Sequence, residues 1–162
     1  MARDPIPTWY FAVVVVKHGD RFLLVQERKH GQLWYLPAGR AEFGESLADA
    51  ALRETLEESG VRVRLLGVLR LEHSPYPQHA RVRAVFLAEP SGPTEPKKEA
   101  DGESLQAKWV SVDELSHLPL RGPEVEQLIR FVASGGPCAP VDIIQEEGLP
   151  YPLSGPRPNE EL

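Results

Sequence analysis

The sequence is poor in residues that mark several classes of protein. It has one cysteine, Cys138, so the chain cannot form an internal disulfide bond. Because that cysteine lies in a Gly/Pro-rich stretch away from any nucleophile motif, we interpret it as incidental. Basic residues number 18 against 24 acidic ones, and the net charge of −6 offers no basic surplus to neutralise phosphates. We therefore expect no nucleic-acid polymer as a partner.

Long hydrophobic runs are absent as well. The apolar stretch FAVVVV near the beginning is interrupted by Lys17, far short of the roughly 20 residues that span a bilayer. No targeting segment is visible. We expect a cytoplasmic protein with no membrane association. A small phosphorylated substrate is compatible with the acidic charge, because bound cations would set the local field.

Length and hydrophobic pattern predict one globular domain. The 162 residues are 41% hydrophobic, enough for a sizeable core. Val-rich runs around a Gly-Asp turn predict a hairpin with strands at residues 9–16 and 21–27. Further patterns predict strands at residues 61–71, 81–88 and 106–110 and a helix at residues 123–133. Strands that alternate with two helices favour an α/β layered fold. We assign residues 1–134 to this domain and expect residues 135–162, rich in Pro and Gly, to form an extended or mobile tail.

The segment GRAEFGESLADAALRETLEESGV, residues 39–61, is the most informative part of the chain. Ser46 followed by Asp49 resembles a capping box, and Gly60 supplies the left-handed residue that commonly ends a helix. These features predict a helix at residues 46–59. Its Glu54, Glu57 and Glu58 stand at i, i+3 and i+4, which places three carboxylates on one face.

Clustered carboxylates in a last helical turn oppose both one another and the helix dipole. Stability alone would favour Lys or Arg there, whereas a divalent cation resolves the conflict because hard oxygen ligands suit magnesium or manganese. A solvated acidic helix face is the alternative. The complete spacing of the segment favours the metal site.

The fixed positions of this segment resemble the box of the Nudix hydrolases, which cleave diphosphate linkages in nucleotides and related compounds with divalent metal. The matching residues are Gly39, Glu45, Arg53, Glu54, Glu57, Glu58 and Gly60. The resemblance implies a Nudix α/β/α sandwich with a mixed central sheet, and Mg²⁺ as cofactor, with Mn²⁺ as a substitute.

Roles for the box residues follow from the same resemblance. Glu54, Glu57, Glu58 and the main-chain carbonyl of Ala38 would hold metal that bridges substrate phosphates and activates water. Arg53 would orient the carboxylates, and it can reach Asp49 or Glu57, each four residues away. The proton acceptor lies either within the box or in a later loop, where Glu103 is the candidate; a solvated loop acid is the alternative for Glu103. For Glu45, helix-end electrostatics and a role near metal stay open.

The substrate class rests on weaker likeness. The runs WYLPAGR, VRAVFLAEP, KKEADGESLQAKW and LPLRG resemble the Nudix branch that converts oxidised purine nucleoside diphosphates, such as 8-oxoguanine forms, to monophosphates. An ADP-ribose pyrophosphatase is the alternative, because Pro75 and Pro77 follow the box at about the distance that marks that subgroup. A nucleotide-sensing Nudix module without catalysis is a third reading, although such modules usually lack a box carboxylate and this chain lacks none.

Aromatic and basic residues outside the box are candidates for substrate binding. Trp34, Tyr35, Phe43 and Tyr76 could stack on a purine, and Arg81 could meet an anionic substrate. Core or loop packing is the alternative for the aromatic residues, as a solvated strand face is for Arg81. We interpret Lys97 and Lys98 as part of a solvated loop. The sequence does not decide between a monomer and a homodimer.

Overall fold

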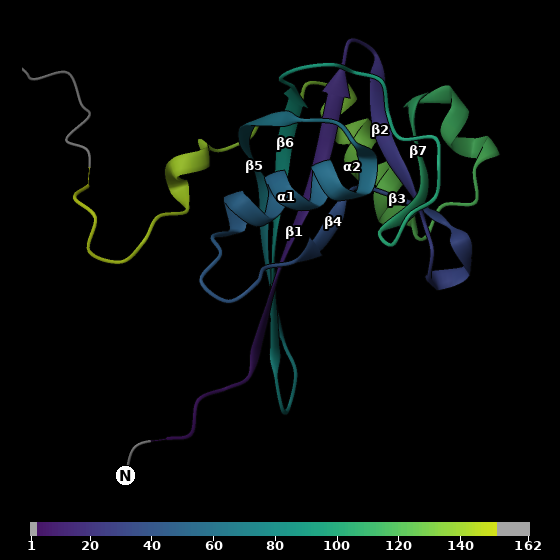
Figure 1. Ribbon diagram of the computed structural model, residues 1–162. Coiled ribbons are helices and arrows are strands. Elements are labelled where there is room, and N and C mark those ends of the chain that lie inside the picture. Colours follow the sequence, from purple (N-terminus) through teal and green to yellow (C-terminus); the bar gives the residue numbers. More distant parts are fainter. Residues whose placement is uncertain (1–2, 152–162) are drawn as a thin grey trace, which may run out of the picture.

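A mixed sheet lies between two helices in the computed structural model, which describes residues 3–151 (Figure 1). The strand order is β3-β2-β1-β6-β5, with β4 also paired to β1 and β7 to β2. The strands are β1 (Thr8–His18), β2 (Arg21–Glu27), β3 (Trp34–Tyr35), β4 (Ala38–Arg40), β5 (Val63–Pro75), β6 (Ala80–Pro90) and β7 (Ser104–Ser111). The helices are α1 (Leu47–Ser59) and α2 (Pro123–Ala133), with short 3-10 turns η1 (His30–Gln32), η2 (Asp113–His117) and η3 (Val141–Ile143).

Strand β1 lies inside the sheet because its valines are apolar on both faces. Val14 and Val16 belong to the core beneath α1, and the alternate residues Val13 and Val15 belong to the core beneath α2. Figure 1 shows α1 in front of the sheet and α2 behind it. The predicted α/β/α sandwich with a mixed sheet is therefore confirmed.

Strands β1 and β6 run parallel, and β5 pairs antiparallel with β6 at the edge of the sheet. The hairpin of β5 and β6 extends well beyond the helical layers together with the start of β1 (Figure 1). The predicted strands are confirmed, although β5 runs on to Pro75, four residues past the predicted end. No helix within residues 3–151 is long and apolar enough to cross a membrane.

Helix α1 begins and ends as its sequence predicts. The Ser46 hydroxyl accepts a hydrogen bond from the Asp49 amide at 3.0 Å, and Gly60 closes the helix with a φ of 75°. These local signals leave little freedom in where the helix starts and stops. The positions of Glu54, Glu57 and Glu58 along its last turns follow directly.

The segment after α2 differs from the predicted extended or mobile tail. Ala139 exchanges two backbone hydrogen bonds of 2.8 Å with Val68 on the outer edge of β5, and η3 follows. Ala139, Val141 and Ile144 then pack against the core beneath α1. An edge strand presents unpaired amide and carbonyl groups, and pairing with them orders a segment whose composition alone predicts a loop. Residues 152–162 of the predicted tail lie outside the described part of the chain.

Candidate active site

Helix α1 and strand β4 approach each other closely at Glu54 and Gly39. A Cβ atom at residue 39 would overlap the carboxyl group of Glu54. The φ of Gly39 is not positive, so this glycine is not needed for a left-handed backbone conformation. Its role is steric: the missing side chain makes room for a carboxylate from the facing helix.

Arg53 ties four groups together beside this contact. Its Nε and Nη2 donate to the two carboxylate oxygens of Glu45 at 2.7 and 2.8 Å, and its Nη1 donates to Glu54 at 2.7 Å and Glu57 at 3.1 Å. Nη2 also donates to the carbonyl of Arg40 at 3.1 Å. Hydrogen bonding to Arg53 is the main reason that the pKa of Glu45 is lowered. The predicted contact with Glu57 is present, whereas Asp49 instead accepts from Ser46.

Glu58 has a different environment. Its Oε2 accepts the amide of Ala38 at 3.0 Å, and in the described part of the chain no Lys or Arg forms an ion pair with it. Burial raises its pKa to about 8, and the charges of Glu54, Glu27 and Glu103 add to that rise. An acid that is hard to ionise among other acids lies where a cation would be most stabilising.

Glu27, at the end of β2, was missed by the sequence analysis. Its Oε1 accepts from Arg121 at 2.7 Å, but Oε2 is buried without a hydrogen-bond partner among the described residues. Burial also raises the pKa of Glu54, with Glu103 among the smaller causes, so the predicted loop candidate does lie near the box acids. Nothing in the local sequence of Glu27 distinguishes it from an ordinary strand-end acid.

The predicted metal ligands lie at one end of α1 but are not gathered around one point. Within residues 3–151, no three His, Cys, Asp or Glu side chains form a ready-made metal cluster. Arg53 draws Glu54 and Glu57 toward its guanidinium, while Glu58 turns to Ala38. The donor set nevertheless fits a divalent cation, because it offers carboxylate oxygens and an orphaned buried oxygen of Glu27. Binding would require these carboxylates to rotate inward.

Lys97 anchors the loop that brings Glu103 to the acids. Its amide donates to the Ser59 carbonyl and its Nζ donates to the Glu57 carbonyl, at 2.8 and 2.9 Å. Nζ also donates to the carboxylate of Asp101 at 2.7 and 2.8 Å. The interpretation of Lys97 as a solvated loop residue was wrong. It supplies the positive charge that the end of α1 favours.

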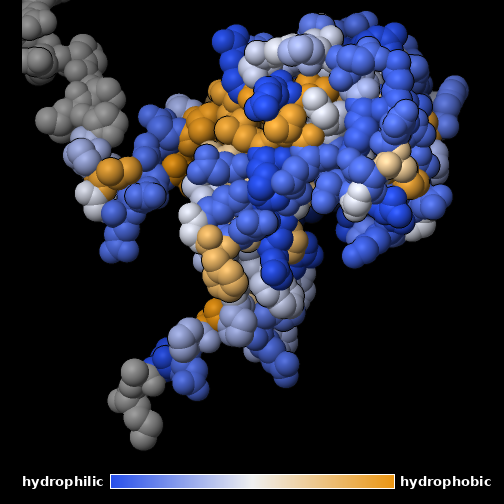
Figure 2. All heavy atoms as spheres, viewed as in Figure 1, coloured by the Kyte–Doolittle hydropathy of each residue, from blue (hydrophilic) through white to orange (hydrophobic). Residues whose placement is uncertain are grey.

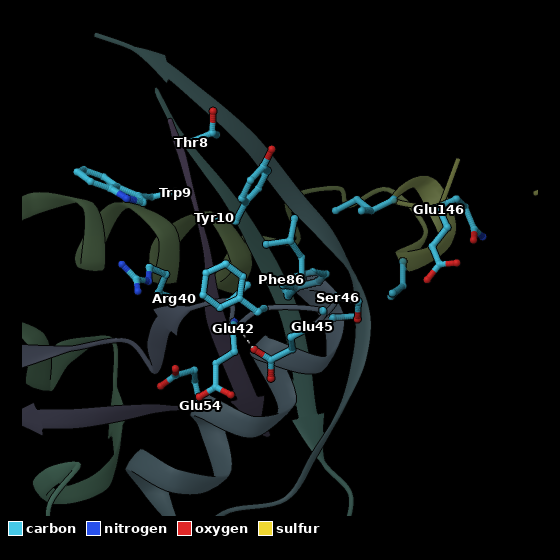
Figure 3. A pocket seen from close by; sticks show the side chains of 18 of the residues that line it. Thr8, Trp9, Tyr10, Arg40, Glu42, Glu45, Ser46, Glu54, Phe86 and Glu146 are labelled. Atoms are coloured by element: carbon cyan, nitrogen blue, oxygen red, sulfur yellow. Dashed lines mark hydrogen bonds between the residues drawn. The ribbon is translucent and has the colours of Figure 1, made fainter. Parts of the chain in front are cut away.

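A large cavity opens next to Glu54 and Glu45, with a volume of about 1410 Å³. Trp9, Tyr10 and Arg40 lie on one side of it, and Glu146 lies across from them (Figure 3). The loop carrying Phe43 and the residues around η3 complete the lining. The face seen in Figure 2 is hydrophilic over α1, with an apolar area beside it on the side toward the C-terminal segment. Carboxylates, aromatic rings and the Arg40 guanidinium therefore line the same cavity.

The NUDIX domain family matches residues 7–132, most of the chain. The chain belongs to the Nudix family. Homo sapiens 8-oxo-dGDP phosphatase NUDT18 is 38% identical to it over 143 residues, covering 86% of this chain and 43% of that protein. NAD-capped RNA hydrolase NudC from Escherichia coli is 35% identical over 121 residues, covering 72% and 44%. A NUDIX hydrolase structure from Nitrosomonas europaea has a TM-score of 0.71 at 29% identity, covering 86% and 97%. The chain spans less than half the length of these two curated relatives, and the predicted family is confirmed.

Of the aromatic residues predicted to bind substrate, Phe43 lines the Nudix-domain cavity. Trp34 and Tyr35 do not, because both are 5% exposed in the core beneath α2. Tyr35 donates a short hydrogen bond to Glu124, and burial is the main cause that raises its pKa to about 12. The structure thus places Trp34 and Tyr35 in packing roles.

Tyr76 and Arg81 also lie away from the cavity lining. Tyr76 stacks on His79, whose ring lies 4.7 Å from that of Trp9, so the tip of the hairpin contacts the cavity residue Trp9 without lining the cavity itself. Arg81 stacks over the ring of Phe11 at 4.6 Å. Because side chains alternate along β6, Arg81 shares the face of Val85, which belongs to the core beneath α2 and not to the α1 side.

Three cavity residues of the Nudix domain were missed. Trp9 and Tyr10 begin β1 and remain 44% and 47% exposed, unlike the buried valines that follow. Arg40 follows Gly39, and no ion pair joins it to another described residue. The sequence signal was present only for Arg40, as a cation at the edge of the box. From the sequence, Trp9 and Tyr10 look like ordinary strand residues. Only the tertiary structure shows that the start of β1 extends beyond the helices that cover the sheet.

Proposed function

We propose that this protein is a magnesium-dependent hydrolase that cleaves a diphosphate linkage in a nucleotide. The observation that carries the proposal is the shared cavity: Glu54 and Glu45 meet exposed aromatic rings and the Arg40 guanidinium in one space. A nucleotide needs these features together, because its phosphates are anionic and its base is flat and apolar on both faces.

Glu54, Glu57, Glu58 and the Ala38 carbonyl would hold the magnesium, with Mn²⁺ as a substitute. The metal, once bound, would neutralise phosphate charge and favour ionisation of the attacking water. Arg53 positions the carboxylates: its guanidinium donates hydrogen bonds to Glu45, Glu54 and Glu57. Gly39 leaves the space that the Glu54 carboxylate fills.

A carboxylate must accept the proton of the attacking water. Glu58 and Glu103 are the two candidates, and the charge of Glu103 is one of the smaller causes that raise the pKa of Glu58. Glu58 is half-buried, whereas Glu103 is exposed on a loop. Glu103→Gln would lower the rate constant by roughly 10² to 10⁴ if that residue is the base. If Glu58 is the base, Glu103→Gln leaves most of the rate.

For the substrate we propose purine nucleoside diphosphates, including the oxidised 8-oxoguanine forms, converted to monophosphates. The support is the similarity to the relatives named 8-oxo-dGDP phosphatase. Trp9, Tyr10 and Phe43 would contact the base, and Arg40 the phosphates. The ADP-ribose alternative drew on Pro75 and Pro77, which shape the projecting hairpin and do not line the cavity.

The test is a magnesium-dependent screen of oxidised and normal nucleoside di- and triphosphates, ADP-ribose, dinucleoside polyphosphates and NADH. We expect a nucleoside monophosphate as the product, and a chelator should abolish its formation. The value of kcat/KM should be highest for an oxidised purine nucleoside diphosphate. Binding of nucleotide without any product would instead identify a sensing module. Highest efficiency on ADP-ribose would overturn the substrate assignment while leaving the hydrolase class intact.

A further inference from the structure

The cavity has a wall that lies outside the Nudix match. That match ends at residue 132, yet part of the lining comes from the segment after α2. The lining residues of this segment are Val141, Ile144, Gln145, Glu146 and Leu149. We call residues 139–149 the C-terminal wall.

Pairing to β5 determines the position of the wall. Ala139 and Val68 exchange two backbone hydrogen bonds of 2.8 Å. Gly67 permits this approach, because a Cβ there would overlap the Cys138 sulfur and stand 2.7 Å from the Ala139 carbonyl oxygen. The wall is thus attached to the domain by a specific contact with the edge of β5.

The wall offers two kinds of chemistry to the cavity. Val141 and Ile144 are half-buried and pack against the same core as Phe86, which also lines the cavity. Glu146 is exposed on the same wall, and no ion pair with another described residue neutralises its carboxylate. Figure 3 shows Glu146 across the cavity from Trp9 and Arg40, and away from Glu54. An apolar surface beside a free acceptor suits a flat base with donor groups on its edge.

We propose that the C-terminal wall binds the nucleobase, with Ile144 against its face and Glu146 accepting hydrogen bonds from its edge. A carboxylate matches two adjacent N–H donors, as on the Watson–Crick edge of guanine, and mismatches adenine, which has a ring acceptor there. The wall thereby selects guanine-type bases, oxidised at C8 or not. This inference rests on the proposed function, because it assumes a purine nucleotide in the cavity.

Neighbouring residues of the same type provide matched controls. Ile144 and Glu146 line the cavity, whereas Ile143 and Glu147 do not and are exposed. The measurement is calorimetric titration, in magnesium, of the full chain with the non-hydrolysable α,β-methylene analogues of guanosine and adenosine diphosphate. Glu146→Gln should reduce the guanosine-over-adenosine preference about 10-fold, and Glu147→Gln should leave it unchanged. Ile144→Ala should weaken binding of both analogues about 10-fold, and Ile143→Ala should weaken neither.

Gly67→Ala tests the wall without touching the cavity. It should weaken binding of both analogues, whereas Gly92→Ala, where an added Cβ meets nothing within 4 Å, should not. Equal effects of Glu146→Gln and Glu147→Gln, or no binding of either analogue by the unmodified protein, would overturn the assignment.

The two proposals fail in different ways. Loss of magnesium-dependent hydrolysis on every nucleotide would contradict the proposed function, while the binding ratios would still report on the wall. Normal hydrolysis together with unchanged binding ratios in Glu146→Gln would contradict the wall alone. Because Glu146 is exposed, this variant removes no core contact, and a melting curve confirms its folding.

Discussion

The carboxyl group of Glu54 occupies the space where residue 39 would carry a side chain, so that Gly39 and Glu54 are in direct contact across β4 and α1. Arg53 donates to the same carboxylate at 2.7 Å. One glycine and one arginine therefore determine where a candidate metal ligand lies. The acid cluster depends on this contact between two elements as well as on the spacing along the helix.

Gly39→Ala should move Glu54 away from β4. A shift of about 1 Å at a catalytic constellation can cost roughly 100-fold in rate, and we expect a loss of that size in kcat/KM. Steady-state kinetics on the best substrate of the screen measures it. Gly92→Ala, where an added Cβ meets nothing within 4 Å, is the control. Full activity of Gly39→Ala would show that the position of Glu54 does not matter.

Arg53→Lys should weaken metal-dependent activity by roughly 10- to 100-fold. A lysine keeps the charge but cannot donate to both oxygens of Glu45 and also reach Glu54 and Glu57. The apparent magnesium affinity, from activity against metal concentration, is the measurement. Arg130→Lys is the matched control, since within residues 3–151 Arg130 forms an ion pair only with Glu126, one turn away on α2. An unchanged magnesium dependence in Arg53→Lys would contradict the organising role.

Magnesium should stabilise the fold as well as support turnover. A ligand at 100 times its Kd adds about 2.7 kcal/mol to the free energy of unfolding when it binds only the native state. We expect the melting temperature to rise with magnesium in the unmodified protein and to rise much less in Glu58→Gln. Glu126→Gln removes a half-buried acid of α2 on the opposite side of the sheet and should keep the full response. An equal response in Glu58→Gln would place the metal elsewhere.

Asp101 should contribute to stability in a pH-dependent way. Its hydrogen bond to Lys97, with backbone donors from Glu103 and Ser104, lowers its pKa from 3.8 to about 2. Because the folded state favours the ionised form, the contribution is complete above pH 3.8 and is lost as the pH falls through about 2. Near neutral pH, Asp101→Asn should have a lower melting temperature than the unmodified protein. This difference in melting temperature should disappear as the pH falls to about 2.

Melting curves across this pH range test the expectation. Asp142 is an exposed acid whose side chain forms no hydrogen bond with another described residue. Asp142→Asn should therefore have the same melting temperature as the unmodified protein at every pH. A gap that persists below pH 2 would mean that Asp101 acts through something other than its charge.

Much of the site could be predicted because its signals are local. Three signals each involve residues within a few positions of one another: Ser46 caps the start of α1, the left-handed Gly60 ends it, and the acids stand at i, i+3 and i+4. Helix geometry alone then places the carboxylates on one face. The partial failure concerned their orientation, since Arg53 and Ala38 hold the carboxylates apart.

Substrate residues were harder to predict because aromatic side chains serve packing and recognition equally well. Trp34 and Tyr35 are covered by α2, whereas Trp9 and Tyr10 lie where β1 extends past its helical cover. Arg83 shows the same effect: it donates to Glu72 at 2.9 Å and to Glu124 at 2.7 Å, in a network that no sequence spacing suggests. Exposure at these positions depends on elements far away in the sequence.

The sequence by itself indicated the family, through the resemblance of residues 39–61 to the Nudix box, although it did not predict the short strands β3 and β4. It also determined the longer strands, the two helices and the position of the acids on α1, because these follow from periodicity and capping over short spans. Only the tertiary structure decided which aromatic residues face the cavity, why residue 39 lacks a side chain, and that residues 139–149 close one wall. The physical reason is that burial, close approach and pairing to the edge of β5 arise between residues tens of positions apart, where local patterns carry no information.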